Sequence, residues 1–165
     1  MTGPQKHTMH KRPELLQERV HDTYRNAATP KGPRVCGTCG AVFETGRWRW
    51  GNAPENAGHG TCPACHRIAD NYPAGVVACT GSFVTPHVVE MTAIARNVEA
   101  REGSEHPLER IMSITSGEGE LTIETTGTHL ARRIGKALER ALHGDLAFQQ
   151  AEGEHFVRAR WHRDA

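Results

Sequence analysis

The sequence predicts an α+β protein in which a basic N-terminal arm precedes two folded parts. Two Cys-x-x-Cys pairs flank a short segment of alternating side chains, which indicates a small β-ribbon. Farther along, strand-like segments alternate with two segments of helical period, which indicates a larger α/β domain. Charge divides the 165-residue chain in the same way, since Lys and Arg clearly outnumber Asp and Glu only at the N-terminal end. We therefore expect three regions, residues 1–34, 35–70 and 71–163.

Residues 1–34 carry seven Lys or Arg against three Asp or Glu, and four prolines interrupt them. This composition predicts a basic arm that is largely disordered. The alternative is a short helix from Pro13 to Tyr24, because Pro suits the first turn of a helix. Its apolar side would be formed by Leu15, Leu16, Val20 and Tyr24.

Residues 35–70 contain four of the five cysteines. Cys36 and Cys39 form one pair, and Cys62 and Cys65 form the second pair after 22 intervening residues. A Cys-x-x-Cys turn brings two sulfurs to one ion, so two such turns supply four thiolates for tetrahedral Zn²⁺ at ~2.3 Å. Gly40 suits the tight turn after the first pair. We therefore predict that these four cysteines hold a structural zinc ion.

Other uses of the thiols remain open to different degrees. Four thiolates also suit iron, so the sequence does not separate zinc from iron. A redox dithiol is disfavoured, because it would need one pair rather than two. His59 and His66 lie near the pairs, but all four Cys are present, so we expect neither to be a ligand. A closed four-cysteine site leaves no open position for a substrate, which counts against metal catalysis.

The segment between the pairs, AVFETGRWRW, predicts a β-hairpin with too few apolar residues to fold by burial alone. Zinc binding contributes about 10 kcal/mol to the folding of such small modules. Alternation places Trp48 and Trp50 on one face and Arg47 and Arg49 on the other. With Arg67, these residues form a candidate nucleic-acid surface of stacking rings and phosphate-binding guanidinium groups. The alternative is that the two tryptophans pack the ribbon against the larger domain.

Residues 71–163 read as strand, helix, hairpin, helix and a final pair of short strands. The first strand is PAGVVACTGSF, in which Cys79 is expected to be a small packed residue. The helices are TPHVVEMTAIARNVEAREG and THLARRIGKALERALHG, the latter capped by Thr128. A β-α-β-β-α-β order with a short extra strand is typical of the ferredoxin-like fold. We expect two helices on one face of an antiparallel sheet, with the other face open.

The composition and the motifs of the chain disfavour several classes of protein. The chain has no apolar run near the ~18 residues of a membrane span and no secretory signal, so we expect a cytoplasmic protein. It contains no Walker loop, no G-x-G-x-x-G and no H-E-x-x-H motif. Its eleven histidines are scattered. A histidine-dependent enzyme is therefore the less favoured class, and would need His129, His87 or His106 to converge with Glu109 or Glu124.

Several segments together resemble a family of small, uncharacterised bacterial zinc-ribbon proteins. They are HDTYRNA, CGTCGAVFETGRWRWGNAP, CPACHRIADNYPAG, HPLERIMSI and THLARRIGKALERALHGDL, which span about residues 14–162. The resemblance implies that Cys36, Cys39, Cys62 and Cys65 are metal ligands and implies no activity. A weaker similarity links the paired knuckles and the α/β region to the zinc-bearing export adaptor of the large ribosomal subunit. That adaptor carries more cysteine pairs than this chain.

The favoured functional hypothesis is a zinc-ribbon binding module associated with RNA or the ribosome. Phosphate contacts would come from the basic arm and from Arg47, Arg49 and Arg67, with Trp48 or Trp50 stacking on bases. The alternative is a protein-interaction adaptor or homodimer that uses the open face of the sheet and binds no nucleic acid.

Overall fold

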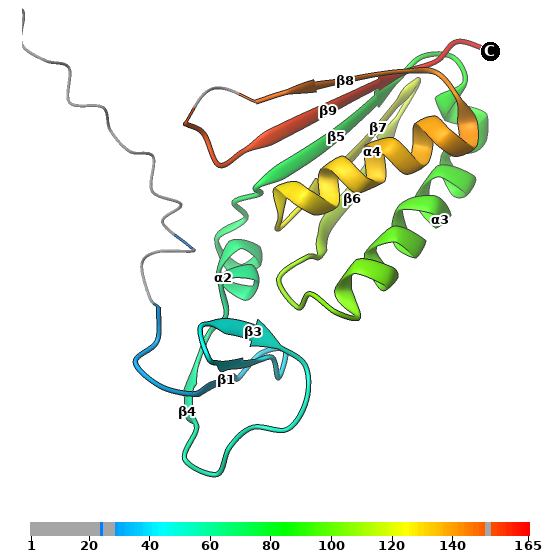
Figure 1. Ribbon diagram of the computed structural model, residues 1–165. Helices are drawn as coiled ribbons and strands as arrows, with labels where there is room; N and C mark the ends of the chain where they lie inside the picture. Colours follow the sequence, from blue (N-terminus) through cyan, green and yellow to red (C-terminus); the bar gives the residue numbers. More distant parts are fainter. Residues whose placement is uncertain (1–23, 25–28, 151–152) are drawn as a thin grey trace, which may run out of the picture.

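The computed structural model describes Tyr24, residues 29–150 and residues 153–165. The described residues form three α-helices and two β-sheets, which confirms the α+β class. The smaller sheet lies at one end of the molecule and the larger sheet at the other, with helix α2 between them (Figure 1). Within the described residues, no helix has the length and apolar character needed to cross a bilayer. The short helix predicted in the arm lies outside the described residues except for Tyr24.

The smaller sheet has the strand order β3-β2-β1-β4. Its strands are β1 (Arg34–Cys36), β2 (Val42–Glu44), β3 (Arg47–Arg49) and β4 (Gly58–Gly60). The predicted hairpin corresponds to the antiparallel pair β2–β3. Its two turn residues, Thr45 and Gly46, have φ angles of 50° and 85°, the conformation that tight two-residue hairpins require. β4 pairs parallel with β1 and completes the sheet on the side away from the hairpin.

Helix α2 (Pro63–Asp70) begins at the second cysteine pair. Cys62 is its N-cap residue, and the Cys62 sulfur accepts a hydrogen bond from the Cys65 N–H. Pro63 occupies the first turn, where a missing N–H costs nothing. This helix was not predicted from the sequence. We call residues 34–70, from β1 through α2, the ribbon.

The larger sheet has the strand order β6-β7-β5-β9-β8. It is formed by β5 (Gly75–Thr80), β6 (Ile111–Gly117), β7 (Glu120–Thr125), β8 (Asp145–Gln149) and β9 (Val157–His162). Helices α3 (Val84–Gly103) and α4 (Thr128–Leu142) both cover one face of it (Figure 1). β9 runs parallel to its neighbour β5, so the sheet is not the fully antiparallel one that the sequence predicted. We call residues 75–162 the α/β domain.

β9 lies inside the sheet and β8 at its edge. After α4 the chain enters the sheet at its edge as β8, then reverses and inserts β9 between β8 and β5. Val157, Ala159 and Trp161 of β9 are all fully buried, whereas Leu146 and Phe148 of β8 are only partly buried. The interior position of β9 therefore buries one complete row of apolar side chains against the core.

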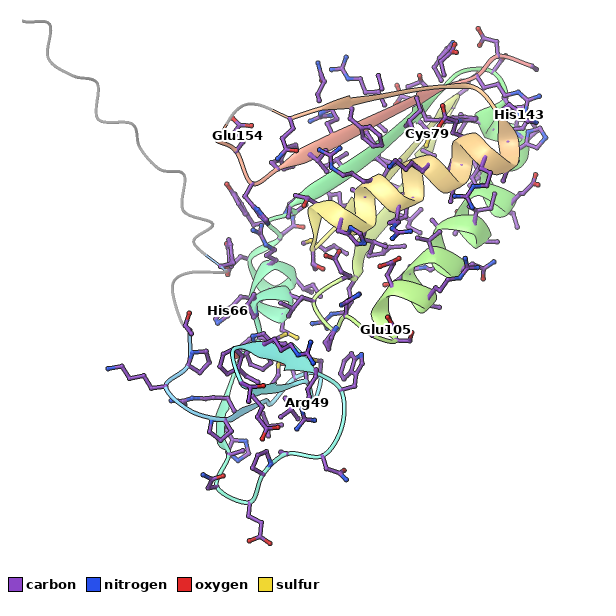
Figure 2. The ribbon with its side chains drawn as sticks, in the orientation of Figure 1. Arg49, His66, Cys79, Glu105, His143 and Glu154 are labelled. Carbon is purple, nitrogen blue, oxygen red and sulfur yellow. The ribbon has the colours of Figure 1, made fainter. Side chains whose placement is uncertain are left out.

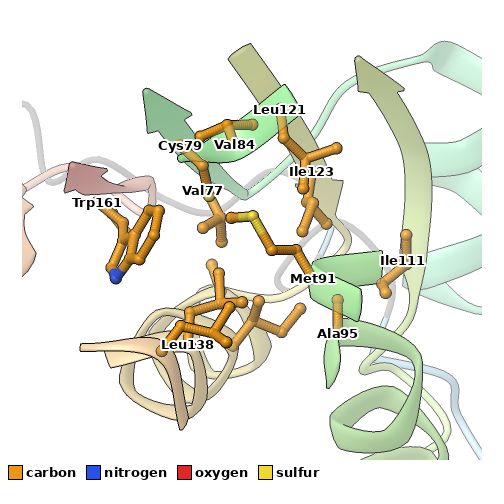
Figure 3. Packing of buried hydrophobic residues seen from close by; sticks show 14 of the residues in the cluster. Val77, Cys79, Val84, Met91, Ala95, Ile111, Leu121, Ile123, Leu138 and Trp161 are labelled. Atoms are coloured by element: carbon orange, nitrogen blue, oxygen red, sulfur yellow. The ribbon is translucent and has the colours of Figure 1, made fainter. Parts of the chain in front are cut away.

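The main core lies between the larger sheet and its two helices. Trp161, Met91, Leu121 and Ile123 are its largest fully buried side chains, and Figure 3 shows them converging with Leu138 of α4. Cys79 packs in the same cluster and is 1% exposed, as expected of a small packed residue. Burial raises the pKa of the Cys79 thiol to about 12, which keeps it protonated and unreactive at neutral pH.

The start of α4 is capped by a side chain from another part of the chain. The N-cap residue is Gly127 rather than the predicted Thr128. The Glu109 carboxylate instead accepts a hydrogen bond of 3.0 Å from the Leu130 N–H in the first turn of α4. A Cβ atom at Gly127 would lie 2.1 Å from that carboxylate, so only glycine admits Glu109 here. Burial raises the pKa of Glu109, which the hydrogen bond from Leu130 partly offsets.

We predict that Gly127→Ala destabilises the α/β domain by about 1–2 kcal/mol, because it displaces the carboxylate that caps α4. Gly117→Ala is the matched control, since a Cβ atom there meets nothing within 4 Å. The control should change stability by less than about 0.5 kcal/mol. Urea denaturation of both variants measures the difference. Equal stability of the two variants would show that Glu109 does not cap α4.

Candidate metal centre

The four predicted cysteine ligands come together in the ribbon. The sulfur atoms of Cys36, Cys39, Cys62 and Cys65 all lie within 4.8 Å of one another. Three of these residues are buried and Cys39 is partly exposed. His59 and His66 do not belong to the group, as the sequence predicted. The centre is therefore a four-sulfur cluster.

Local backbone geometry explains why each pair converges. In the first knuckle the Cys36 N–H donates to the Ala41 carbonyl and the Gly40 N–H donates to the Cys36 carbonyl. Gly40 has a φ of 79°, so the predicted tight turn does use the left-handed region that glycine favours. The second knuckle is the first turn of α2. A hydrogen bond of 3.3 Å from the Cys62 N–H to the Cys36 sulfur joins the two knuckles.

The spacing of the sulfurs fits a tetrahedral metal ion. Four Zn–S bonds of ~2.3 Å place neighbouring sulfurs ~3.8 Å apart. The sulfurs of Cys39 and Cys62 are 3.8 Å apart. All five cysteines are free thiols, so no disulfide competes for them. The donor set of four sulfurs is one that structural zinc sites use.

A cation from the α/β domain lies against the cluster. One terminal nitrogen of Arg110 lies 3.2 Å from the Cys62 sulfur, 3.3 Å from the Cys65 sulfur and 3.8 Å from the Cys39 sulfur. Four thiolates around a divalent ion carry a net charge of −2, which a neighbouring guanidinium partly neutralises. Arg110 therefore contributes both hydrogen bonds and charge to the centre.

The loop that carries Arg110 is fixed from two sides. Thr126, which is 5% exposed, accepts the Arg110 N–H through its hydroxyl oxygen and donates that hydroxyl to the Leu108 carbonyl. Glu109, between them, is held by its hydrogen bond to Leu130. Leu108 also packs against the cysteine cluster. The α/β domain thus places an apolar side chain and a cation on the metal centre.

The thiols differ in their tendency to ionise. Burial acts to raise the pKa of Cys36, but backbone N–H groups from Cys62, Cys39 and Thr38 overcome it and hold the pKa at about 6. Burial raises the pKa of Cys62 and Cys39 above the ordinary thiol value. A metal ion bound by these thiolates would displace protons from Cys39 and Cys62 at neutral pH, and fewer from Cys36, whose pKa is lowered.

The two tryptophans of the hairpin lie in different places. Trp48 is half-buried, packs on Phe43 with ring centroids 5.4 Å apart, and contacts the cysteine cluster. Trp50 lies beyond the end of β3, and its indole N–H donates to the Gly103 carbonyl at the end of α3. Trp50 thus joins the ribbon to the α/β domain, as the packing alternative expected, while 40% of its surface remains exposed.

The three predicted phosphate-binding arginines also differ. Arg47 is exposed. Arg49, which Figure 2 labels on the ribbon, pairs with the Glu44 carboxylate and donates to the Asn52 carbonyl. Arg67 is 4% exposed and lies 4.5 Å from the centre of the Tyr24 ring. Nucleic-acid binding by this set of residues stays a prediction, and the contacts of Arg67 assign it a structural role.

The histidines named for an enzyme do not all share one location. Burial raises the pKa of the Glu109 carboxyl, and the charges of His106 and His129, which both lie near it, act to lower that pKa by less. His87 stacks on Phe83 with ring centroids 3.6 Å apart and contacts the Phe83 carbonyl. His129 lies 3.2 Å from the Glu102 carboxylate. Glu124 accepts a hydrogen bond from the Ser113 hydroxyl instead of facing a histidine.

Sequence reasoning missed the residues that the α/β domain contributes to the centre. Arg110 is 45 residues from Cys65, the nearest cysteine of the cluster in sequence. The only signal was its place in the HPLERIMSI segment, one of those that carry the family resemblance. Nothing in that segment shows that its arginine faces sulfur.

Comparison of the chain with protein-family models, with curated proteins and with solved structures finds no match.

We predict that Arg110→Gln weakens zinc binding about tenfold, because residues that hydrogen-bond to metal ligands contribute effects of this size. Arg110→Lys should lose less, since it keeps the charge but not the planar fork of donors. The matched control is Arg140→Gln, at an exposed position in the last turn of α4. Competition with a chromophoric chelator measures the affinities. An unchanged affinity of Arg110→Gln would contradict the role assigned to this residue.

Proposed function

We propose that the chain is a zinc-ribbon binding module in which a structural zinc ion folds the ribbon and fixes it on the α/β domain. The observation that supports this most strongly is the four-sulfur cluster, whose sulfurs lie within 4.8 Å and are contacted by Arg110. Four protein ligands complete a tetrahedral sphere and leave no position for a substrate. The role of the metal would therefore be to stabilise the fold of the ribbon and not to bind a substrate.

We also propose a fold type for each of the two parts of the molecule. The ribbon would be a zinc ribbon made of two knuckles and the β2–β3 hairpin. The α/β domain would be a ferredoxin-like domain in which β9 has been added between β5 and the last strand of the usual order. Zinc rather than iron is favoured because four-cysteine structural sites most commonly hold zinc.

For the partner we propose RNA, either alone or in the ribosome. Lys31 is exposed just before the ribbon begins, and Arg47 is exposed on the ribbon at the start of β3. Cations on a small aromatic-bearing module are typical of proteins that bind phosphate backbones. The ribosome is included as a source of the RNA because the paired knuckles are similar to those of the ribosomal export adaptor, which carries more cysteine pairs than this chain.

The open face of the larger sheet gives less support to the homodimer alternative. The side chains there include Glu124 of β7 and Arg158 and Arg160 of β9. The residues that alternate with these arginines, Val157, Ala159 and Trp161, are buried in the core. Stable homodimer interfaces are usually richer in apolar surface. This face would need a partner of complementary charge.

We predict that the zinc-loaded protein binds single-stranded RNA with an affinity that falls steeply between about 50 and 200 mM salt. Each cation that contacts a phosphate releases condensed counterions from the RNA. Added salt reduces the entropy gained by this release, so the affinity falls. Filter binding at the two salt concentrations measures it, with purified ribosomes as a second ligand. The control is protein treated with a chelator, in which the ribbon should unfold and lose binding.

Absence of salt-sensitive binding to either RNA or ribosomes would contradict the proposed partner. It would leave the structural zinc site standing, because that site rests on the sulfur geometry alone.

A further inference from the structure

A groove of about 590 Å³ lies beside the metal centre on the ribbon. Tyr24, residues 29–31, three strands of the smaller sheet and α2 all contribute to its lining. The side chains that matter to its chemistry are Tyr24, Lys31, Arg34, Trp48, Thr61 and His66. Its volume falls within the roughly 300–1,000 Å³ of small-molecule sites. We call it the Trp48 groove.

Strand register explains how Trp48 and Arg34 come to line one groove. Trp48 of β3 pairs with Phe43 of β2, and Phe43 pairs with Arg34 of β1. Directly paired residues project from the same face of a sheet, so the three side chains form one row. The row continues to Gly58 of β4.

The glycines of β4 shape the Arg34 end of the groove. A Cβ atom at Gly58 would lie 3.4 Å from a terminal nitrogen of Arg34, so the absent side chain lets the guanidinium lie over this strand. One of its N–H groups donates to the His59 carbonyl at 3.1 Å. A guanidinium has five N–H groups in a planar fork, which leaves donors for an anion.

Another part of the lining is the aromatic ring of Tyr24, which residues at and just after the end of α2 hold in place. Tyr24 stacks on Tyr72 with ring centroids 5.7 Å apart, and its hydroxyl donates to the Asp70 carboxylate. Arg67 lies over the same ring. Arg67, one of the predicted phosphate-binding residues, therefore positions a wall of the groove.

The charge of the lining is one-sided. Lys31 and Arg34 are cations, and among the residues that the structure describes no carboxylate is part of the lining. In the part of the chain that the structure describes, no acidic side chain lies within ion-pair distance of the Lys31 ammonium. Aromatic walls beside uncompensated cations fit a ligand that combines a flat ring with an anionic group.

We propose that the Trp48 groove binds one nucleotide of a single-stranded RNA, with the base stacked on Trp48 and the phosphate held by Lys31 and Arg34. This inference rests on the proposed function and assigns it a site. Every base has a stacking face, so such a groove binds RNA with little preference for sequence. An acidic peptide would satisfy the cations but would add no stacking on the part of the Trp48 ring that lines the groove.

The test measures binding of a fluorescent single-stranded RNA decamer to full-length, zinc-loaded protein by anisotropy. Lys31→Gln and Arg34→Gln should each weaken binding about tenfold at low salt. Each should also reduce, by about one, the slope of the logarithm of the binding constant against the logarithm of the salt concentration. Lys136→Gln and Arg140→Gln make the same charge changes at exposed positions of α4 and are the matched controls. They should change affinity by less than about twofold. One zinc ion per chain in every variant shows that the ribbon is still folded.

A second measurement follows Trp48 without altering it. In an NMR titration with the same RNA, the Trp48 indole N–H signal should shift as the base stacks, and the buried Trp161 signal should not. Trp48→Phe identifies the signal. Polyglutamate serves as the probe for a purely acidic ligand.

The outcomes separate the groove from the proposed function. Weakening confined to Lys31→Gln and Arg34→Gln, with a shift of the Trp48 signal, supports the groove. RNA binding that these variants and the α4 controls affect equally would overturn the groove and leave RNA binding intact. The groove variants could lower the affinity for polyglutamate as much as that for RNA, while RNA leaves the Trp48 signal unchanged. The groove would then bind any polyanion by charge without stacking, and the proposal would be wrong. Absence of any RNA binding by the unaltered protein would overturn both proposals.

Discussion

The approach of four cysteine sulfurs to one point determines how the ribbon folds. Its strands are only three residues long, and Val42 and Phe43 are its principal buried strand residues. Such a module buries too little apolar surface to offset the entropy lost when its chain is ordered. A metal ion bound by four thiolates supplies free energy of about 10 kcal/mol in comparable modules. The hairpin, the parallel strand β4 and the start of α2 are all arranged around those sulfurs.

The same centre is where the two parts of the molecule meet. Arg110 and Leu108 reach it from a loop of the α/β domain, and Trp50 of the ribbon reaches back to the end of α3. The loop is in turn fixed by Thr126 and by the Glu109 cap on α4. A metal ion bound at the cluster would therefore couple its own binding to the orientation of the ribbon on the domain. Trp48 packs against the cluster and also lines the groove, so the metal would affect the shape of the groove as well.

Local chemistry was predictable from the sequence, and long-range contacts were not. The spacing of the Cys pairs specifies a four-sulfur site because each knuckle is a turn of a few residues. Gly40 and the hairpin turn could be predicted for the same reason. Arg110 could not, because its contact with the sulfurs depends on how a distant loop packs. The place of β9 was missed because it depends on pairing with β5, a strand that is distant in the sequence. The cap of α4 was assigned to Thr128, since no local rule shows that the carboxylate of Glu109 arrives there.

The central claim is that a single zinc ion is bound by Cys36, Cys39, Cys62 and Cys65 and by no other ligand. Zinc K-edge X-ray absorption of the purified full-length protein, combined with a metal count, tests it most directly. The account predicts one zinc ion per chain and a first coordination sphere of four sulfurs at ~2.3 Å. A protein without bound metal, or a sphere that contains nitrogen or oxygen, would contradict it.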